Sequence, residues 1–252
     1  MTQLGLEEFK PCGKCNNGFL ISKSGFASKC QCRIDHENRS HEILIMRKAN
    51  LIDDNTSRQY FDFLSSYNFL SYKGPDNEEN LLKLKKYTDR FTEKYSAFNL
   101  FFYGLPGTQK TTLAKYLILR LLRQGKTGYY ILVNDYIMIA EESIRNEEKK
   151  KLLDYINSVD LLVLDEFDED KIIMYSSNWK ESNLFPQIKY RLEMVRKSTI
   201  FCSNRHVDSL GNKFEGAIQN LIERETLNGL FTFSDVYAKF REKVDLSKIW
   251  ED

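Results

Sequence analysis

Short apolar runs alternate with longer segments of helical periodicity from residue 99 onward. The runs are four to six residues long and are typical of buried strands, expected at 99–103, 129–133, 161–164, 198–203 and 230–233. Apolar residues between them recur at helical spacing, with helices expected at 111–123, 136–144, 147–156, 185–196 and 214–223. Strands that alternate with helices are typical of a parallel sheet covered on both faces. The pattern therefore predicts an α/β fold.

The first 98 residues lack this alternation. Residues 1–40 are polar, cysteine-rich and rich in turn formers, as in a small module. Helices are expected at 41–50 and 78–95 and a turn at 73–77, while 55–72 carries many aromatic residues without a regular period. We therefore expect three parts: a module at 1–50, a helical and aromatic linker region at 51–98, and an α/β core at 99–252.

The composition excludes several classes of protein. Hydrophobic residues make up 42% of the 252 residues, enough for a packed core, so wholesale disorder is excluded. Lys and Arg number 37 against 36 Asp and Glu, so any nucleic-acid contact must come from a local patch. No run approaches the roughly 18 apolar residues of a membrane helix. The polar N-terminus has no apolar segment behind it, so we expect a cytoplasmic protein without a membrane partner.

A glycine-rich segment follows the first predicted strand. Residues 104–111 are Gly-Leu-Pro-Gly-Thr-Gln-Lys-Thr, close to the phosphate-loop pattern of Gly, four residues, Gly, Lys and Ser or Thr. Backbone N–H groups and the helix N-terminus of such a loop surround the β-phosphate. Lys110 would reach the β and γ oxygens, and Thr111 would hold Mg²⁺. The candidate residues for binding ATP or ADP are Gly104, Pro106, Gly107, Thr108, Gln109, Lys110, Thr111 and Thr112.

One position departs from this pattern. Gln109 stands where the second glycine is expected, and glycine there lets the backbone approach phosphate closely and adopt unusual dihedral angles. A side chain at this point is expected to distort the loop or to narrow access to it, although Gly107 keeps part of the flexibility. The alternative is an accidental strand, turn and helix that happens to carry a lysine.

Acidic and polar residues end two later strands. Asp165 and Glu166 follow the third predicted strand, and Asn204 follows the fourth. In phosphate-loop ATPases an Asp at this place binds Mg²⁺ and the next Glu orients or deprotonates the attacking water. Asp165 is therefore a candidate nucleotide and Mg²⁺ ligand, and Glu166 a candidate catalytic residue. Asn204 is a candidate catalytic residue that would hydrogen-bond the water; alternatively it only ends the strand. The acidic residues that come next are expected to be solvated: Asp168, Glu169 and Asp170.

Four cysteines form two close pairs near the N-terminus. Cys12-Gly-Lys-Cys15 and Cys30-Gln-Cys32 are separated by 14 residues. In a reducing compartment such a cluster binds metal more often than it forms disulfides. Four thiolates suit a closed, tetrahedral, structural Zn²⁺ site, and so small a segment has too little core to fold without one. The alternative is four reduced thiols without a ligand.

The order of these motifs resembles an AAA+ ATPase: a strand, GLPGTQKT and a helix, then LLVLDE, then STIFCSN. Within that class it is most similar to the DnaC/DnaI-type helicase-loader and IstB-like group, over roughly residues 55–245. The resemblance implies a P-loop AAA+ core with a five-stranded parallel sheet and a lid that is reduced or absent. It also implies an arginine finger at Arg224, reaching the γ-phosphate in a neighbouring subunit, and a second nucleotide sensor at Arg241. The alternative for Arg224 is a surface side chain paired with a neighbouring glutamate.

The function implied by this resemblance is an ATP-dependent replicative helicase loader, a weak ATPase carried by a phage or mobile element. The zinc module at 1–50 would dock on a DnaB-type helicase, and the AAA+ cores would self-associate and bind single-stranded DNA. A second interpretation is an IstB-like transposition regulator acting on duplex DNA, which the cysteine module disfavours. A third is a nucleotide-binding adaptor without turnover, which Gln109 keeps open.

Overall fold

A computed structural model of the chain describes residues 8–72, 78–168, 184–207 and 217–233. The chain divides into two compact units, Met1–Ser66 and Tyr67–Asp252, so the linker region expected at 51–98 is shared between them. Within the described ranges, no helix combines the length and apolar character needed to cross a bilayer. The turn expected at 73–77 lies outside these ranges, as do Glu169, Asp170, Arg241 and the segment after Phe233 in which a lid would be sought.

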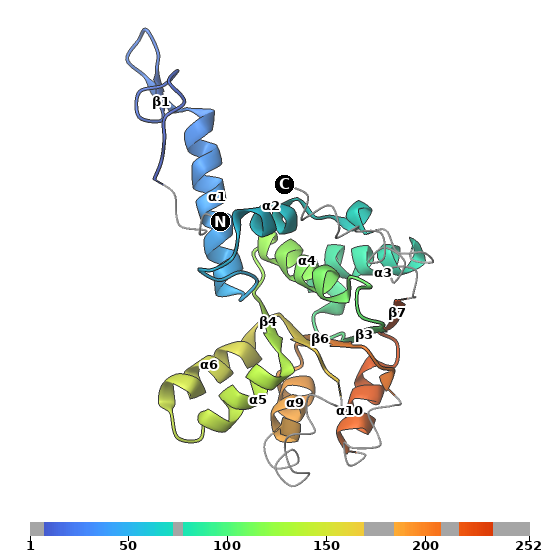
Figure 1. Cartoon of the computed structure of the whole chain (residues 1–252). Coiled ribbons are helices and arrows are strands. Elements are labelled where there is room, and N and C mark those ends of the chain that lie inside the picture. The colour runs from blue at the N-terminus through green and yellow to red at the C-terminus, as the bar shows by residue number, and fades with distance from the viewer. Residues whose placement is uncertain (1–7, 73–77, 169–183, 208–216, 234–252) are drawn as a thin grey trace, which may run out of the picture. The chain divides into compact units, whose positions relative to one another are not determined.

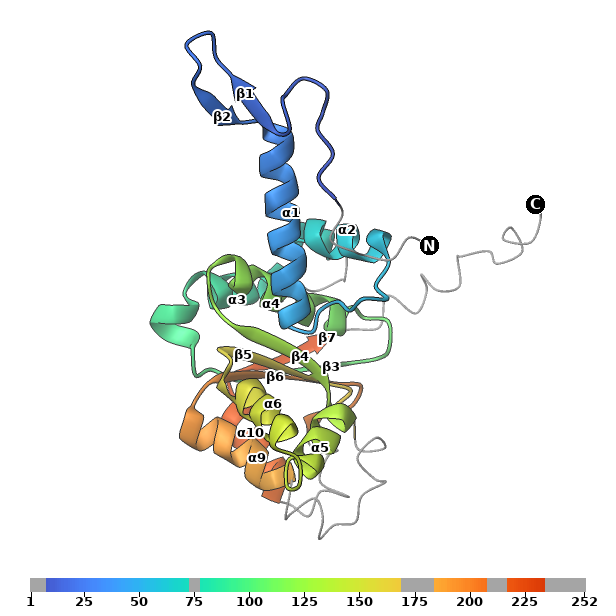
Figure 2. The ribbon, with the colours of Figure 1, turned by 90° about the vertical axis from the view of Figure 1, so that its left-hand side faces the viewer.

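The first unit begins with a hairpin followed by a long helix. Strands β1 (Phe19–Ile21) and β2 (Ala27–Lys29) pair antiparallel beside the start of α1 (Gln31–Lys48), as Figure 2 shows. The helix predicted at 41–50 thus begins ten residues earlier than expected. Its first turns are polar and carry no apolar period. They are stabilised instead by side-chain pairs one turn apart, Gln31 with Asp35 and Arg33 with Glu37.

The remainder of this unit packs α2 (Arg58–Ser66) against α1. Ile43 and Met46 of α1 are buried, as are Phe61 and Leu64 of α2. The guanidinium of Arg39 lies 5.1 Å from the ring centre of Phe61 and donates to Asp62. The aromatic residues of 55–72 that gave no regular period therefore belong in part to a short amphipathic helix.

The second unit is a five-stranded sheet in which every pairing is parallel. The strand order is β4-β5-β6-β3-β7, with bounds β3 (Leu100–Gly104), β4 (Gly128–Leu132), β5 (Leu161–Asp165), β6 (Ser198–Ser203) and β7 (Leu230–Phe233). The helices are α3 (Glu78–Asp89), α4 (Lys110–Arg123), α5 (Val133–Glu142), α6 (Glu147–Ser158), α9 (Phe185–Lys189) and α10 (Ala217–Thr226). Figures 1 and 2 show α3 and α4 on one face and the other four on the opposite face. The predicted α/β fold with a five-stranded parallel sheet is confirmed.

Two predicted helices change type along their length. The helix expected at 78–95 ends at Asp89 and is followed by a π-helical turn, η2 (Phe91–Tyr95). The helix expected at 185–196 is α-helical only in α9 and continues as the π-helical η4 (Tyr190–Val195). A further short 3₁₀ turn, η1 (Phe69–Ser71), lies in the aromatic segment before α3. Apolar spacing marks a buried face but does not separate one helical hydrogen-bond register from the next.

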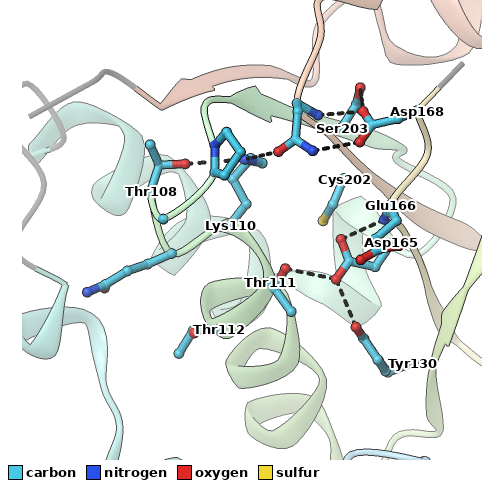
Figure 3. A pocket seen from close by; sticks show the side chains of 14 residues that line it. Thr108, Lys110, Thr111, Thr112, Tyr130, Asp165, Glu166, Asp168, Cys202 and Ser203 are labelled. Atoms are coloured by element: carbon cyan, nitrogen blue, oxygen red, sulfur yellow. Dashed lines mark hydrogen bonds between the residues drawn. The ribbon is translucent and has the colours of Figure 1, made fainter. Parts of the chain in front are cut away.

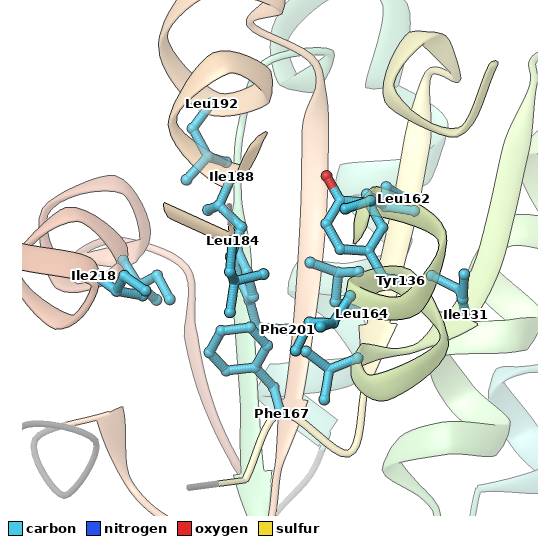
Figure 4. Packing of buried hydrophobic residues seen from close by; sticks show 14 of the residues in the cluster. Ile131, Tyr136, Leu162, Leu164, Phe167, Leu184, Ile188, Leu192, Phe201 and Ile218 are labelled. Atoms are coloured by element: carbon cyan, nitrogen blue, oxygen red, sulfur yellow. The ribbon is translucent and has the colours of Figure 1, made fainter. Parts of the chain in front are cut away.

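The larger core lies between the sheet and α5, α6, α9 and α10 (Figure 4). Phe201 of β6 is at its centre, with its ring stacked on Phe101 of β3 and edge-on to Phe167, at centroid distances of 6.4 and 5.1 Å. Tyr136 of α5 and Ile218 of α10 cover the same cluster from the helical side. This core holds the carboxyl ends of β3, β5 and β6 in fixed register.

An arginine is buried at the opposite end of the sheet. Arg191 of η4 is 2% exposed and donates to the carbonyl oxygens of Asn157 (2.6 Å), Val159 (3.1 Å) and Ser198 (2.6 Å) and to the Thr199 hydroxyl (2.9 Å). Burial lowers the pKa of its guanidinium to about 10. The side chain thereby joins the end of α6 to the start of β6, satisfying carbonyls that neither element satisfies itself.

Candidate nucleotide site and metal centre

The carboxyl ends of β3, β5 and β6 meet at a cavity of ≈ 470 Å³ (Figure 3). This is where ligands bind in open parallel sheets, and the size is within the range of small-molecule sites. The predicted residues that line it are Pro106, Gly107, Thr108, Gln109, Lys110, Thr111, Thr112, Asp165, Glu166 and Asn204. The lining residues that the sequence did not single out for this site are Tyr130, Asp168, Cys202 and Ser203. The fold therefore gathers segments far apart in the chain into one place.

The loop between β3 and α4 depends on unusual backbone angles. Gly104 has φ 153°, and a Cβ there would lie 2.2 Å from the carbonyl oxygen of Phe233, so a side chain is excluded. Gly107 has φ 90°. Gln109, directly before α4, has φ 64° and ψ 15°, the left-handed conformation that glycine adopts most easily. For a residue with a Cβ that conformation costs ~1–2 kcal/mol.

Lys110 is the first residue of α4 and is only 7% exposed. Its ammonium donates to the carbonyl oxygens of Gly104 (2.6 Å) and Leu105 (3.0 Å), to the Thr108 hydroxyl (3.3 Å) and to Oδ1 of Asn204 (3.3 Å). Burial lowers the pKa of Lys110. All four acceptors are uncharged oxygens. A phosphate oxygen would be a stronger acceptor for the same donor, because charge-assisted hydrogen bonds exceed neutral ones.

Asp165 ends β5 and is buried beside Thr111. Its Oδ2 accepts from the Thr111 hydroxyl and from the Tyr130 hydroxyl, both at 2.8 Å, and its Oδ1 accepts from the backbone N–H of Glu166 at 2.8 Å. A hydroxyl and a carboxylate side by side are oxygen ligands of the kind Mg²⁺ prefers, so these two residues fit the ion predicted for them. Tyr130 was missed because its place on β4 is visible only once β4 and β5 are paired.

Asp168 is buried, at 7% exposure, so the prediction that it is solvated is wrong. Its carboxylate accepts from the backbone N–H (2.7 Å) and the side-chain Nδ2 (2.6 Å) of Asn204, and from the Ser203 hydroxyl (2.8 Å). The chain turns back after β5, where the N–H of Phe167 donates to the carbonyl of Cys202, and this brings Asp168 beneath the end of β6. Because a carboxylate only accepts, Asn204 must turn its amide nitrogen toward Asp168 and its Oδ1 toward Lys110.

The remaining candidates fall into three groups. Glu166 is exposed at the cavity with φ 53°. Arg224 lies on α10 outside the cavity lining, with a side chain 61% exposed and ion-paired to Glu193 (2.6 Å) and Glu225 (3.0 Å). These carboxylates raise the pKa of its guanidinium. Arg241 lies outside the described residues. The catalytic roles of Glu166, Asn204 and Arg224 and the sensor role of Arg241 stay predictions.

The four N-terminal cysteines converge in the first unit. Their sulfur atoms all lie within 4.8 Å of one another, with Cys12 3.8 Å from Cys15 and 3.7 Å from Cys30, and Cys15 3.6 Å from Cys32. A tetrahedron with Zn–S bonds of ~2.3 Å places its sulfur atoms ~3.8 Å apart. The donor set and its spacing therefore fit zinc.

Hydrogen bonding and burial shift the pKa values of two of these thiols in opposite directions. Cys30 directly precedes α1 and Cys32 lies in its first turn, where the helix N-terminus favours negative charge. A hydrogen bond from the Lys14 backbone, followed by contacts with neighbouring thiols, lowers the pKa of Cys12 to about 7. Desolvation, followed by hydrogen bonds among the thiols, raises the pKa of Cys32 to about 12.

Comparison with known proteins shows what the chain resembles. No known family profile matches the chain. The replicative helicase loader DnaC of Escherichia coli (strain K12) is 29% identical over 132 residues, which cover 52% of this chain and 51% of that protein. The chain thus spans about half the length of the curated relatives it matches. A crystal structure of the DnaC helicase loader aligns with a TM-score of 0.56 and 21% identity, covering 71% of this chain and all of the other.

In sequence and in fold the chain is similar to the DnaC/DnaI-type AAA+ proteins. The same fold extends to AMPPCP-bound DnaA from Aquifex aeolicus, with a TM-score of 0.53, 22% identity, and coverage of 72% of this chain and 55% of that one. The predicted resemblance to this group is therefore confirmed. At these identities the solved structures establish the fold of the AAA+ family, and the assignment of individual residues rests on the contacts described above.

Proposed function

We propose that the chain is a replicative helicase loader controlled by ATP, and that its second unit binds Mg·ATP at the cavity beside β3, β5 and β6. One observation carries the proposal: Lys110, Thr111 and Asp165 converge there, on the family's fold, in the arrangement that a phosphate and its metal require. The likeness to the loader DnaC and to a nucleotide-bound DnaA supports it.

Each lining residue has a distinct task in this proposal. Lys110 exchanges its carbonyl partners for β- and γ-phosphate oxygens. Thr111 and Asp165 hold Mg²⁺, which when bound neutralises charge that develops on the phosphates. Glu166, which is exposed at the cavity, orients or deprotonates a water molecule. Asn204, held by Asp168, presents Oδ1 toward that water and Lys110.

The wider role follows from the family and from the first unit. One structural Zn²⁺ is bound by the four cysteines and joins the segment before β1 to the start of α1: Cys12, Cys15, Cys30 and Cys32. The module at 1–50 docks on a DnaB-type helicase in the cytoplasm. The AAA+ cores self-associate and bind single-stranded DNA, with Arg224 of one copy completing the site of the next.

Point variants at the cavity test the nucleotide site. Lys110→Ala should abolish binding of ATP, measured by calorimetry, because the phosphates lose their buried cation. Glu166→Gln should bind ATP normally and lose turnover. Lys126→Ala, in the turn after the C-terminal end of α4, is the matched control and should bind and hydrolyse ATP like the wild type. Equal affinity in the wild type and Lys110→Ala would refute the assignment.

A second experiment separates the functional alternatives. The wild-type protein is mixed with a DnaB-type helicase, or with duplex DNA, in the presence and absence of ATP. Capture of the helicase supports the loader. ATP-dependent assembly on duplex DNA without helicase capture would instead indicate an IstB-like regulator. Gln109 favours one further candidate, an adaptor that binds ATP without turnover, which steady-state hydrolysis at saturating ATP would exclude.

A further inference from the structure

Gln109 occupies a conformation that its own side chain opposes. It precedes α4 with φ 64°, and its carbonyl accepts the first hydrogen bond of the helix, from the N–H of Leu113 at 2.9 Å. Moving Gln109 out of this conformation would therefore break the start of α4 as well as the loop. The observed geometry requires other contacts to hold the residue where glycine would stay without help.

Two phenols from the segment before α3 reach this loop. The hydroxyl of Tyr67 donates to the side-chain Oε1 of Gln109 at 3.1 Å, and the hydroxyl of Tyr72 donates to the carbonyl oxygen of Thr108 at 3.3 Å. Both tyrosines are buried. The ring of Tyr67 is packed edge-on against Tyr116 of α4, with centroids 5.5 Å apart, so its hydroxyl is fixed relative to the helix.

The two contacts differ in what they require of the loop. Tyr72 holds a backbone atom, which is present whatever the side chain at 109. Tyr67 holds the side chain itself, so this hydrogen bond would be lost if residue 109 were glycine. A glutamine at the glycine position and a tyrosine placed to hold its amide therefore form a pair.

We propose that Tyr67 is a positioning residue for the phosphate loop, and that its hydroxyl holds Gln109 in the left-handed conformation that a glycine would adopt unaided. The inference deepens the proposed nucleotide site and rests on it. Tyr67 touches no phosphate in this scheme; it acts through Gln109. The contact between Tyr67 and Gln109 explains how the loop keeps a left-handed residue at 109 although that residue carries a side chain.

A double-mutant cycle in the full chain tests the pairing. Tyr67→Phe keeps the ring against Tyr116 and removes one hydrogen bond, so the Kd for AMPPCP should rise about fivefold. Gln109→Gly should bind AMPPCP at least as tightly as the wild type. In the Gln109→Gly background, Tyr67→Phe should change the Kd less than about twofold. Tyr72→Phe is the matched control, and its effect should be the same in both backgrounds.

Hydrogen exchange of the backbone amides of Leu105 and of residues 107–109 gives a readout that needs no nucleotide. Exchange should quicken in Tyr67→Phe and should not quicken further when that change is added to Gln109→Gly. Equal effects of Tyr67→Phe in both backgrounds, or none in either, would overturn the inference. If the exchange pattern is as expected but no variant binds AMPPCP, the positioning role stands and the proposed nucleotide site fails.

Discussion

The carboxylate of Asp168 is the most informative single group to alter at the cavity. It is buried and receives three hydrogen bonds, two on Oδ1 from the Ser203 hydroxyl and the Asn204 backbone, and one on Oδ2 from the Asn204 amide. Asp168→Asn keeps the shape but replaces one acceptor by an NH₂ donor. If the new NH₂ replaces Oδ1, it faces the backbone N–H of Asn204. If it replaces Oδ2, it faces the side-chain amide nitrogen of Asn204.

The size of the effect follows from these contacts. An unpaired buried polar group costs ~1–3 kcal/mol, and hydrogen bonds to a charged acceptor contribute more than neutral ones. We therefore expect the free energy of unfolding to fall by about 2–3 kcal/mol. If the new NH₂ faces Asn204, that amide must rotate, and its nitrogen then faces the Lys110 ammonium, which lies 3.3 Å from Oδ1. Turnover should fall at least tenfold, because the group expected to orient the water is reversed.

Urea unfolding and steady-state ATP hydrolysis measure the two effects separately. Asp160→Asn is the matched control, because Asp160 also accepts several hydrogen bonds, from Thr127, and pairs with Lys197, yet does not line the cavity. It should lower stability without a comparable loss of turnover. If Asp168→Asn lowers turnover no more than Asp160→Asn does, Asp168 does not position Asn204.

Two further predictions concern the metal and assembly. Metal analysis of the purified protein should give about one zinc per chain. The Cys30→Ser variant should contain no zinc. A wild-type protein with four freely titratable thiols and no metal would contradict the site. Arg224→Ala should leave ATP binding by the isolated chain intact while reducing ATP-dependent assembly, followed by light scattering, and hydrolysis together. If the residue is only a surface partner of Glu193 and Glu225, the variant will assemble and hydrolyse ATP like the wild type.

The strands were predictable to within about one residue, most clearly β3, β5 and β6, because these three are buried on both faces and are therefore largely apolar runs. The start of α1 was not, because its first turns are stabilised by polar side-chain pairs that leave no apolar period. The apolar spacing of 185–196 likewise predicted a buried helix but not the change from α-helix in α9 to π-helix in η4. Local pattern identifies burial well and identifies hydrogen-bond register poorly.

The candidate site divides in the same way. Lys110 and Thr111 belong to a contiguous motif, and Asp165 ends an apolar run, so all three were visible in the sequence. Asp168 looked like one of several solvated acids, because only the pairing of β5 with β6 brings it under Asn204. Tyr67 belongs to a segment without periodicity, and its contact with Gln109 spans 42 residues. A hydrogen bond between residues so far apart in the sequence can be identified only from the folded structure.

The position of the two phenols bears on how the protein can be dissected. The chain divides between Ser66 and Tyr67, so the second unit begins with the residue that holds Gln109. A fragment started at residue 99, where the apolar strands begin, would remove Tyr67, Tyr72 and α3 together, although it would retain every strand of the sheet. Such a fragment would carry an intact phosphate-loop sequence on an unsupported loop. A fragment cut from this protein to test nucleotide binding should therefore begin no later than Tyr67.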